Sequence, residues 1–297
     1  MARVLILLSV VTLIGGLTPI AARMAVQELP PMTVAWVRFG GAGILLWLAL
    51  RIRGLRPPFS RRDLPGLLGL GLLGVSVNQG GFLIGVKLSN ASHAALFYAL
   101  APVLAFWISV GLRRAAFSVS MLVAAMLAFT GAACVIWPSF FGGPENAARP
   151  STMFTGDLLL LVAVTSWAAF SVFSKPAIHR YGAMRTLAAV FLLGAVMQTP
   201  LALFDIGRVN FGGVTWKGLS GLAFMTVLTS FVNYLLWYNV LARYEPTRAM
   251  IVVNGGFLIA VLTEWLAFGE PLTGWFFAGC ALIISAIGLD VLCGVRR

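Results

Sequence analysis

Long apolar runs recur along the chain, and short polar or turn-rich breaks separate them. A bilayer core needs roughly 20 apolar residues per helix, so runs of this length with few charges are typical of membrane-spanning helices. The breaks include ELPPM at 28–32, RGLRPPFSRRD at 53–63 and FGEPL at 268–272. The pattern predicts an all-α membrane protein with ten transmembrane helices, at 4–26, 34–51, 64–86, 92–111, 117–137, 156–179, 183–205, 217–241, 247–268 and 273–293.

The first run has a second interpretation, because Arg3 followed by an apolar stretch is also how a secretory signal peptide begins. The run is longer than a typical signal-peptide core, and no convincing small-residue cleavage site leads into soluble sequence. We therefore interpret it as the first transmembrane helix.

Composition agrees with a membrane protein. Of the 297 residues, 60% are hydrophobic and 10% are charged, whereas a soluble domain carries about 25% charged residues. A soluble fold of this composition would expose large apolar patches, so the lipid bilayer is the expected surroundings. The net charge of +12 also suggests nucleic acid, but the basic residues lie at the ends of apolar runs and form no single stripe. No nucleic-acid partner is expected.

The placement of Lys and Arg predicts the orientation in the membrane. If the N-terminus is cytoplasmic, 15 of these residues fall on the cytoplasmic side and 5 on the other, with Arg38 inside the second run. Cytoplasmic loops carry an excess of Lys and Arg, so this bias places both termini in the cytoplasm of a bacterial inner-membrane protein. Two cytoplasmic termini require an even number of helices, which agrees with ten.

The two halves of the chain align at a constant shift of 154 residues. Ser76 falls on Ser230, Gln79 on Asn233 and Pro102 on Gly256. We predict a five-helix repeat at 1–138, a periplasmic linker at 139–155 and a second five-helix repeat at 156–297. Because five is odd, the second repeat enters from the opposite side, as in alternating-access transporters with inverted repeats. The alternative is that any two polytopic segments share apolar composition.

Polar and aromatic side chains gather on single faces of several predicted helices. Intramembrane polar residues are costly and usually face a cavity or another helix. On the third helix, Gly74, Asn78, Gly81 and Gly85 share a face, and Gly81 and Gly85 allow a close helix approach. Each such face has a packing or interface-anchoring alternative. The candidate substrate-binding residues are Asn78, Gln79, Tyr98, Trp167, Ser171, Asn233, Tyr234, Trp237, Tyr238 and Asn254.

Charged and metal-binding residues are scarce inside the runs. His93 and Glu264 are possible groups for coupling transport to protons, and a structural hydrogen bond is the equal alternative for Glu264. For Arg38 we favour a partner side chain or a backbone carbonyl over substrate. The two histidines and three cysteines form no metal-binding spacing, so we expect no metal and no cofactor.

Three segments resemble the EamA-type family of the drug/metabolite transporter superfamily. They are PPMTVAWVRFGGAG at 30–43, ASHAALFYALAPVLAFWISV at 91–110, and EPTRAMIVVNGGFLIAVLTEWLAFGEPLTGWFFAGCALIISAIG at 245–288. The resemblance covers essentially the whole chain. It departs from the family pattern in RRAAF, where a Gly-Glu turn is common, and in Gly256, where proline is common.

The resemblance implies a central cavity lined by the first, third, fourth, sixth, eighth and ninth helices. It also implies an exporter of small metabolites, and the scarcity of charge among the aromatic residues favours neutral or aromatic amino acids. A drug or other metabolite permease and a channel-like facilitator are alternatives. An intramembrane enzyme is disfavoured, since no nucleophile motif, metal motif or acidic pair is present. Nothing in the sequence indicates an obligate protein partner.

Overall fold

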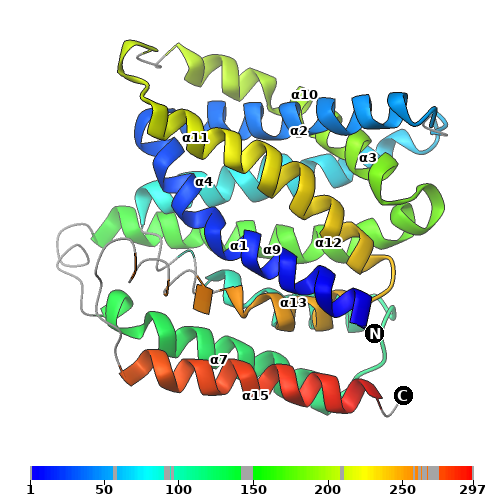
Figure 1. Ribbon diagram of the computed structural model, residues 1–297, viewed down its shortest axis with the longest axis vertical. Coiled ribbons are helices and arrows are strands. Elements are labelled where there is room, and N and C mark those ends of the chain that lie inside the picture. Colours follow the sequence, from blue (N-terminus) through cyan, green and yellow to red (C-terminus); the bar gives the residue numbers. More distant parts are fainter. Residues whose placement is uncertain are drawn as a thin grey trace. The chain divides into compact units, whose positions relative to one another are not determined.

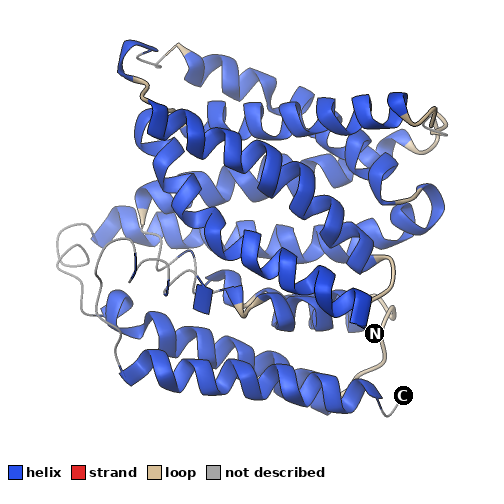
Figure 2. Cartoon of the chain, viewed as in Figure 1, coloured by secondary structure: helices blue, strands red, loops and turns tan. Residues whose placement is uncertain are grey.

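The computed structural model is mainly helical over the residues that it describes, which are 2–55, 59–89, 94, 97–141, 150–207, 211–256, 258–259, 262, 266 and 274–295 (Figure 2). Over these ranges no residue lies in a β-strand. In a bilayer only helices and closed barrels satisfy every backbone N–H and C=O group internally, and the helices seen here are one of these two architectures. Six helices of the described residues are long and apolar enough to cross a membrane, at Ile6–Glu28, Pro31–Ile52, Leu64–Leu88, Phe154–Tyr181, Ala183–Ile206 and Trp216–Leu241.

The individual elements are shown in Figure 1, coloured along the chain. Proline stands at the start of several of them, where its missing N–H costs no hydrogen bond. The elements are α1 (Ala2–Glu28), α2 (Pro31–Ile52), α3 (Leu64–Gly71), the π-helix η1 (Leu72–Val77), α4 (Asn78–Leu88), α6 (Ala101–Gly111), α7 (Val119–Phe141), α9 (Pro150–Tyr181), α10 (Ala183–Ile206), the 3-10 helix η2 (Phe211–Gly213), α11 (Trp216–Phe224), the π-helix η3 (Met225–Asn233), α12 (Tyr234–Leu241), α13 (Pro246–Val253) and α15 (Gly274–Val295).

The helices form two compact units, and each contains parts of both halves of the sequence. Unit 1 comprises Met1–Leu83 and Phe173–Arg243, and unit 2 comprises Ile84–Val172 and Tyr244–Arg297. Helices extend into both ends of the predicted linker at 139–155, because α7 ends at Phe141 and α9 begins at Pro150. Residues 142–149 of that linker lie outside the described residues.

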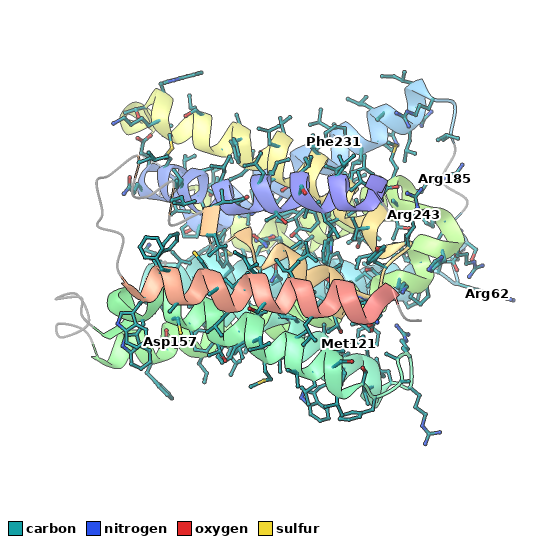
Figure 3. All side chains as sticks on the ribbon, turned by 60° about the horizontal axis from the view of Figure 1, so that its bottom comes forward. Arg62, Met121, Asp157, Arg185, Phe231 and Arg243 are labelled. Carbon is teal, nitrogen blue, oxygen red and sulfur yellow. The ribbon has the colours of Figure 1, made fainter. Side chains whose placement is uncertain are left out.

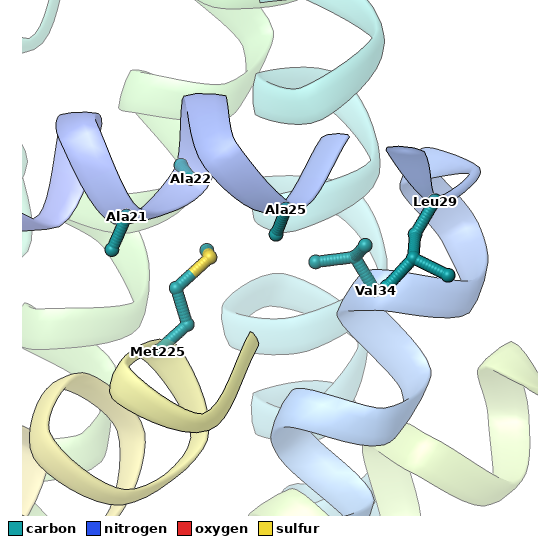
Figure 4. Close-up of a cluster of buried hydrophobic side chains, with 6 residues drawn as sticks. All are labelled: Ala21, Ala22, Ala25, Leu29, Val34 and Met225. Atoms are coloured by element: carbon teal, nitrogen blue, oxygen red, sulfur yellow. The ribbon is translucent and has the colours of Figure 1, made fainter. Parts of the chain in front are cut away.

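In unit 1, α2 packs antiparallel to α10. The indole Nε1 of Trp36 donates to Thr199 Oγ1 at 3.1 Å, and a Cβ added to Gly43 would lie 3.0 Å from Leu192. The α1 and α11 helices pack around the cluster in Figure 4, where Met225 reaches toward the small residues of α1. Small side chains let transmembrane helices approach closely and gain van der Waals contact. The cluster is Ala21, Ala22, Ala25, Leu29, Val34 and Met225.

In unit 2, α7 and α15 lie side by side and antiparallel (Figure 1). A Cβ added to Gly131 would lie 2.8 Å from Ile283 and 2.9 Å from the Gly279 carbonyl oxygen, so the two backbones are almost in contact. At one end the rings of Trp137 and Trp275 stack with centroids 5.6 Å apart. Small residues where α7 and α15 meet thus allow these two apolar helices to pack closely.

Candidate functional site

The candidate substrate-binding residues are divided between the two units. Asn78, Gln79, Asn233, Tyr234, Trp237 and Tyr238 belong to unit 1. Tyr98, Trp167, Ser171 and Asn254 belong to unit 2. We describe each set in its own unit.

In unit 1 four of the six candidate residues lie in or directly after two π-helical segments. The first, Leu72–Val77, leads into Asn78 and Gln79, and the second, Met225–Asn233, leads into Tyr234. The repeat shift of 154 residues carries the first segment onto 226–231, inside the second. A π-helical turn is rare and changes which side chains share a face, and such turns are frequent at functional sites. The two π-helical segments therefore occupy equivalent positions in the two halves of the sequence, which indicates that the π-helical turn is a repeated feature.

Arg38 of α2 joins the two π-helical regions. Its side chain is 3% exposed. The Nε atom donates to Ser230 Oγ at 2.6 Å and the Nη1 atom donates to Gln79 Oε1 at 3.0 Å. Gln79 in turn donates to Asn78 Oδ1. Arg38 therefore has partner side chains, as expected, and one of them is itself a candidate substrate-binding residue.

Arg38 binds Ser230 and Gln79, and each of these has an equivalent residue in the other repeat. In both equivalent residues a buried side-chain oxygen has no hydrogen-bond partner among the described residues. Ser230 corresponds to Ser76 and Gln79 corresponds to Asn233. Among the described residues, neither Ser76 Oγ nor Asn233 Oδ1 accepts or donates a hydrogen bond. A buried polar atom without a partner costs free energy, so each such atom in a native structure needs an explanation. A bound solute or water would supply the missing hydrogen bond.

Aromatic side chains form a wall beside Arg38. The rings of Phe39, Phe191 and Tyr234 meet edge to face, with centroids 4.9 to 5.8 Å apart. One turn further along, Trp237 and Tyr238 of α12 are 3% and 0% exposed. The face predicted on the eighth helix is therefore buried at Tyr234, Trp237 and Tyr238. Asn233 on the same face is half-buried.

In unit 2 two helices are interrupted at equivalent positions. A turn at Leu100 precedes α6, and a turn at Asn254–Gly255 follows α13, although the sequence predicts uninterrupted helices at 92–111 and 247–268. The shift of 154 residues carries Leu100 onto Asn254. The two interruptions also meet, since Asn254 Nδ2 donates to the Ala99 carbonyl oxygen at 3.3 Å. Interrupted segments at corresponding positions of two repeats are a pointer to a transporter binding site.

The remaining candidates of unit 2 lie on α9 and before α6. Ser171 is fully buried, Trp167 is half-buried with its ring centroid 5.9 Å from that of Phe170, and Tyr98 is half-buried. His93 and Glu264 lie outside the described residues. Among the residues that are described, no three His, Cys, Asp or Glu side chains are grouped to hold a metal ion.

Sequence reasoning did not place Arg38, Ser76 or Ser230 among the candidate residues. The signal for the two serines was present, since they are equivalent under the same shift that pairs Gln79 with Asn233. Arg38 could not be placed, because its partners are 41 and 192 residues away in the sequence.

The family model described as the EamA-like transporter family matches residues 2–137 and 154–291. An uncharacterized transporter of Archaeoglobus fulgidus is 25% identical over 96% of this chain and 98% of its own. A probable amino-acid metabolite efflux pump of Salmonella typhimurium is 27% identical over 95% of this chain and 92% of its own. One solved crystal structure superposes with a TM-score of 0.78 at 15% identity and covers 100% of this chain and 99% of its own, so the two share a fold.

Proposed function

Since the chain belongs to the EamA-like transporter family, we propose that it exports small neutral metabolites by alternating access, with neutral or aromatic amino acids as the first candidates. The observation that carries this proposal is the pair of buried oxygens without partners among the described residues, on Ser76 and Asn233, the second of which directly precedes Tyr234 of the aromatic wall. The relative described as an amino-acid metabolite efflux pump supports the same substrate class.

The chemistry of unit 1 suits a solute that is polar at one end and apolar at the other. Hydroxyl and amide oxygens accept hydrogen bonds from an ammonium group, and aromatic faces receive an apolar side chain and attract a cation. The guanidinium of Arg38 already donates to Ser230 and Gln79, so we assign it to holding the site together.

We also propose ten transmembrane helices in two inverted repeats. The shift of 154 residues carries α2 onto 185–206 and α7 onto 273–295, close to α10 and α15. Each of these equivalent pairs packs antiparallel within its unit, through contacts such as Phe39 with Phe191 and Gly131 with Ile283. Equivalent helices of two repeats with the same orientation would run parallel, so the antiparallel pairs support inversion.

The topology can be tested with reporter fusions. A reporter fused after Arg297 should read as cytoplasmic and one inserted near Pro144 as periplasmic, because the Lys and Arg bias of 15 to 5 sets the orientation. Alkaline phosphatase and green fluorescent protein fusions at the same two positions give opposite readouts and so control for expression. A periplasmic C-terminus would remove both the ten-helix count and the inverted repeat.

The substrate assignment can be tested in liposomes that contain the purified protein. Efflux of phenylalanine, threonine and methionine is measured for wild type, Trp167→Ala, Asn233→Ala and Trp237→Ala. Loss of an aromatic contact should weaken substrate binding by about 1–3 kcal/mol. Loss of the Asn233 amide should weaken it by about 0.5–1.5 kcal/mol. Acceleration by unlabelled substrate on the far side should accompany transport and would be absent from a channel-like facilitator.

The burial of Trp237 calls for controls in this experiment. Because its side chain is 3% exposed, truncation also removes packing, so Trp237→Phe is measured beside Trp237→Ala. Trp216→Ala is the matched control, since Trp216 is the first residue of the same helical run, Trp216–Leu241, and is 80% exposed. Wild-type affinity and rate in all the truncated site variants, for every substrate, would show that these residues only pack the helices.

A further inference from the structure

A pocket of about 370 Å³ opens at one end of unit 1, and none of the candidate substrate-binding residues lines it. Its walls come from the end of α2, the segment after it, the junction of α9 with α10, and α12. In Figure 3, Arg185 at this junction lies at the same end of the unit as Arg62 and Arg243. The Lys and Arg bias assigns this end to the cytoplasm, where the membrane surface is negatively charged. The size is that of a small-ligand site.

Two arginines from different elements line this pocket. Arg53 follows the last residue of α2, and Arg185 lies in the first turn of α10. The Nε atom of Arg185 is buried and has no hydrogen-bond partner among the described residues. Guanidinium groups bind oxyanions with paired hydrogen bonds, so a buried N–H that lacks an acceptor points to an anionic ligand.

Asp63, a carboxylate that does not line the pocket, already has hydrogen-bond partners. Asp63 Oδ1 accepts from Arg180 at 3.1 Å, and Asp63 Oδ2 accepts from the amide and the hydroxyl of Ser60, both at 2.8 Å. The neighbouring Tyr181 hydroxyl and the Ser60 donors lower the pKa of Asp63 to about 2. Asp63 is therefore paired with Arg180 and with the donors of Ser60.

The backbone adds further donors to the same pocket. Gly182, with φ 84° and ψ 157°, ends the turn between α9 and α10 and provides no side-chain cap. The first intrahelical hydrogen bond of α10 runs from the Thr186 N–H to the Gly182 carbonyl oxygen at 3.1 Å. The N–H groups of residues 183–185 come before it, at the positive end of a 24-residue helix, and these three residues line the pocket. Such a terminus favours an anion.

We propose that this pocket binds a phosphate group, carried either by the headgroup of an anionic lipid or by free phosphate. A phosphate has enough acceptor oxygens to engage both guanidinium groups and the backbone N–H groups together. Leu50, Leu55 and Leu235 add apolar wall, against which the glycerol and upper acyl chain of a lipid would pack. Basic pockets of this kind on the cytoplasmic side of membrane proteins accept lipid headgroups.

The test uses the full-length protein in dodecyl maltoside, which carries no phosphate. In one arm, radiolabelled inorganic phosphate is measured by equilibrium dialysis. In the other, phosphatidylglycerol is titrated against the protein and bound lipid is counted by native mass spectrometry, with phosphatidylcholine for comparison. Arg53→Gln/Arg185→Gln should weaken saturable binding about tenfold or more, since charge-assisted hydrogen bonds are lost. The matched control Arg61→Gln/Arg62→Gln removes the same charge from exposed positions and should change binding less than about twofold.

Each outcome bears on the proposal. Arginine-dependent binding of phosphatidylglycerol over phosphatidylcholine supports it and names the lipid as the source, and arginine-dependent binding of inorganic phosphate alone supports it and names free phosphate. Absence of saturable binding in both arms overturns it, as does an equal loss in the Arg61→Gln/Arg62→Gln control. If the double variant does not fold, the single change Arg53→Gln decides, because Arg53 is exposed and its loss should still weaken binding severalfold.

Discussion

Replacing Gly85 with leucine should prevent the helices of unit 2 from packing, and we expect little or no folded protein. A Cβ at this position would lie 2.7 Å from Leu160 Cγ and 3.0 Å from the Gly156 carbonyl oxygen of α9. The second contact is with backbone, so no side-chain rotation relieves it. Overpacking costs about 1–3 kcal/mol for small insertions, and a leucine here exceeds that range. Folded yield in detergent, measured by fluorescence-detected size exclusion, gives the result.

Alanine variants at two glycines of α4 provide a matched pair. Gly85→Ala should lower the free energy of unfolding by about 1–3 kcal/mol, because even one methyl group clashes. A Cβ at Gly80 has no neighbour within 4 Å, so Gly80→Ala should be neutral or stabilising by up to about 1 kcal/mol through helix propensity. Equal stability of the two variants would mean that α4 and α9 do not pack at Gly85.

The positions of the long helices could be predicted from the sequence. The prediction of 183–205 compares with Ala183–Ile206, and that of 273–293 compares with Gly274–Val295. Hydropathy is sufficient here, because a bilayer sets the length of the apolar run and turn residues mark its ends. The close approach at Gly85 was also predictable, since a glycine on a helix face permits contact with a neighbouring backbone.

The irregular turns could not be predicted in this way. The π-helical segments at Leu72–Val77 and Met225–Asn233 are as apolar as ordinary helix, and only their hydrogen-bond register differs. The interruptions at Leu100 and Asn254 depend on a contact between distant segments, the hydrogen bond from Asn254 to Ala99. The internal repeat is what relates these features, because each has its counterpart 154 residues away.

The surroundings of the candidate residues could be predicted only in part. The repeat in the sequence pairs the amides of Gln79 and Asn233. It does not predict that the two amides have different surroundings in the structure. Gln79 accepts from Arg38, whereas Asn233 Oδ1 has no partner among the described residues. A single arginine on α2 breaks the equivalence of the two halves, and its reach across 41 and 192 residues is a tertiary property.

Replacing Arg38 with methionine should destabilise unit 1 and abolish transport. The substitution keeps a long side chain but removes the hydrogen bonds to Ser230 and Gln79. Hydrogen bonds to a charged group contribute about 1.5–3 kcal/mol each, and part of this is offset because a charge is no longer buried. We expect a net loss of about 2–4 kcal/mol in the free energy of unfolding. Reversible unfolding in mixed micelles measures it.

The substitution Arg38→Lys distinguishes the contribution of the positive charge to stability from that of the guanidinium geometry. One ammonium group retains the charge but lacks the planar fork that reaches two acceptors on different helices, so Arg38→Lys should recover only part of the stability. Arg51→Lys is the matched control on the same helix, since Arg51 is exposed and its guanidinium lies 4.7 Å from the Trp47 ring centroid. In double-mutant cycles Arg38 should couple to Ser230 and to Gln79 by about 1–3 kcal/mol each. Coupling near zero in both cycles, with full transport by Arg38→Met, would mean that Arg38 does not hold the two π-helical regions together.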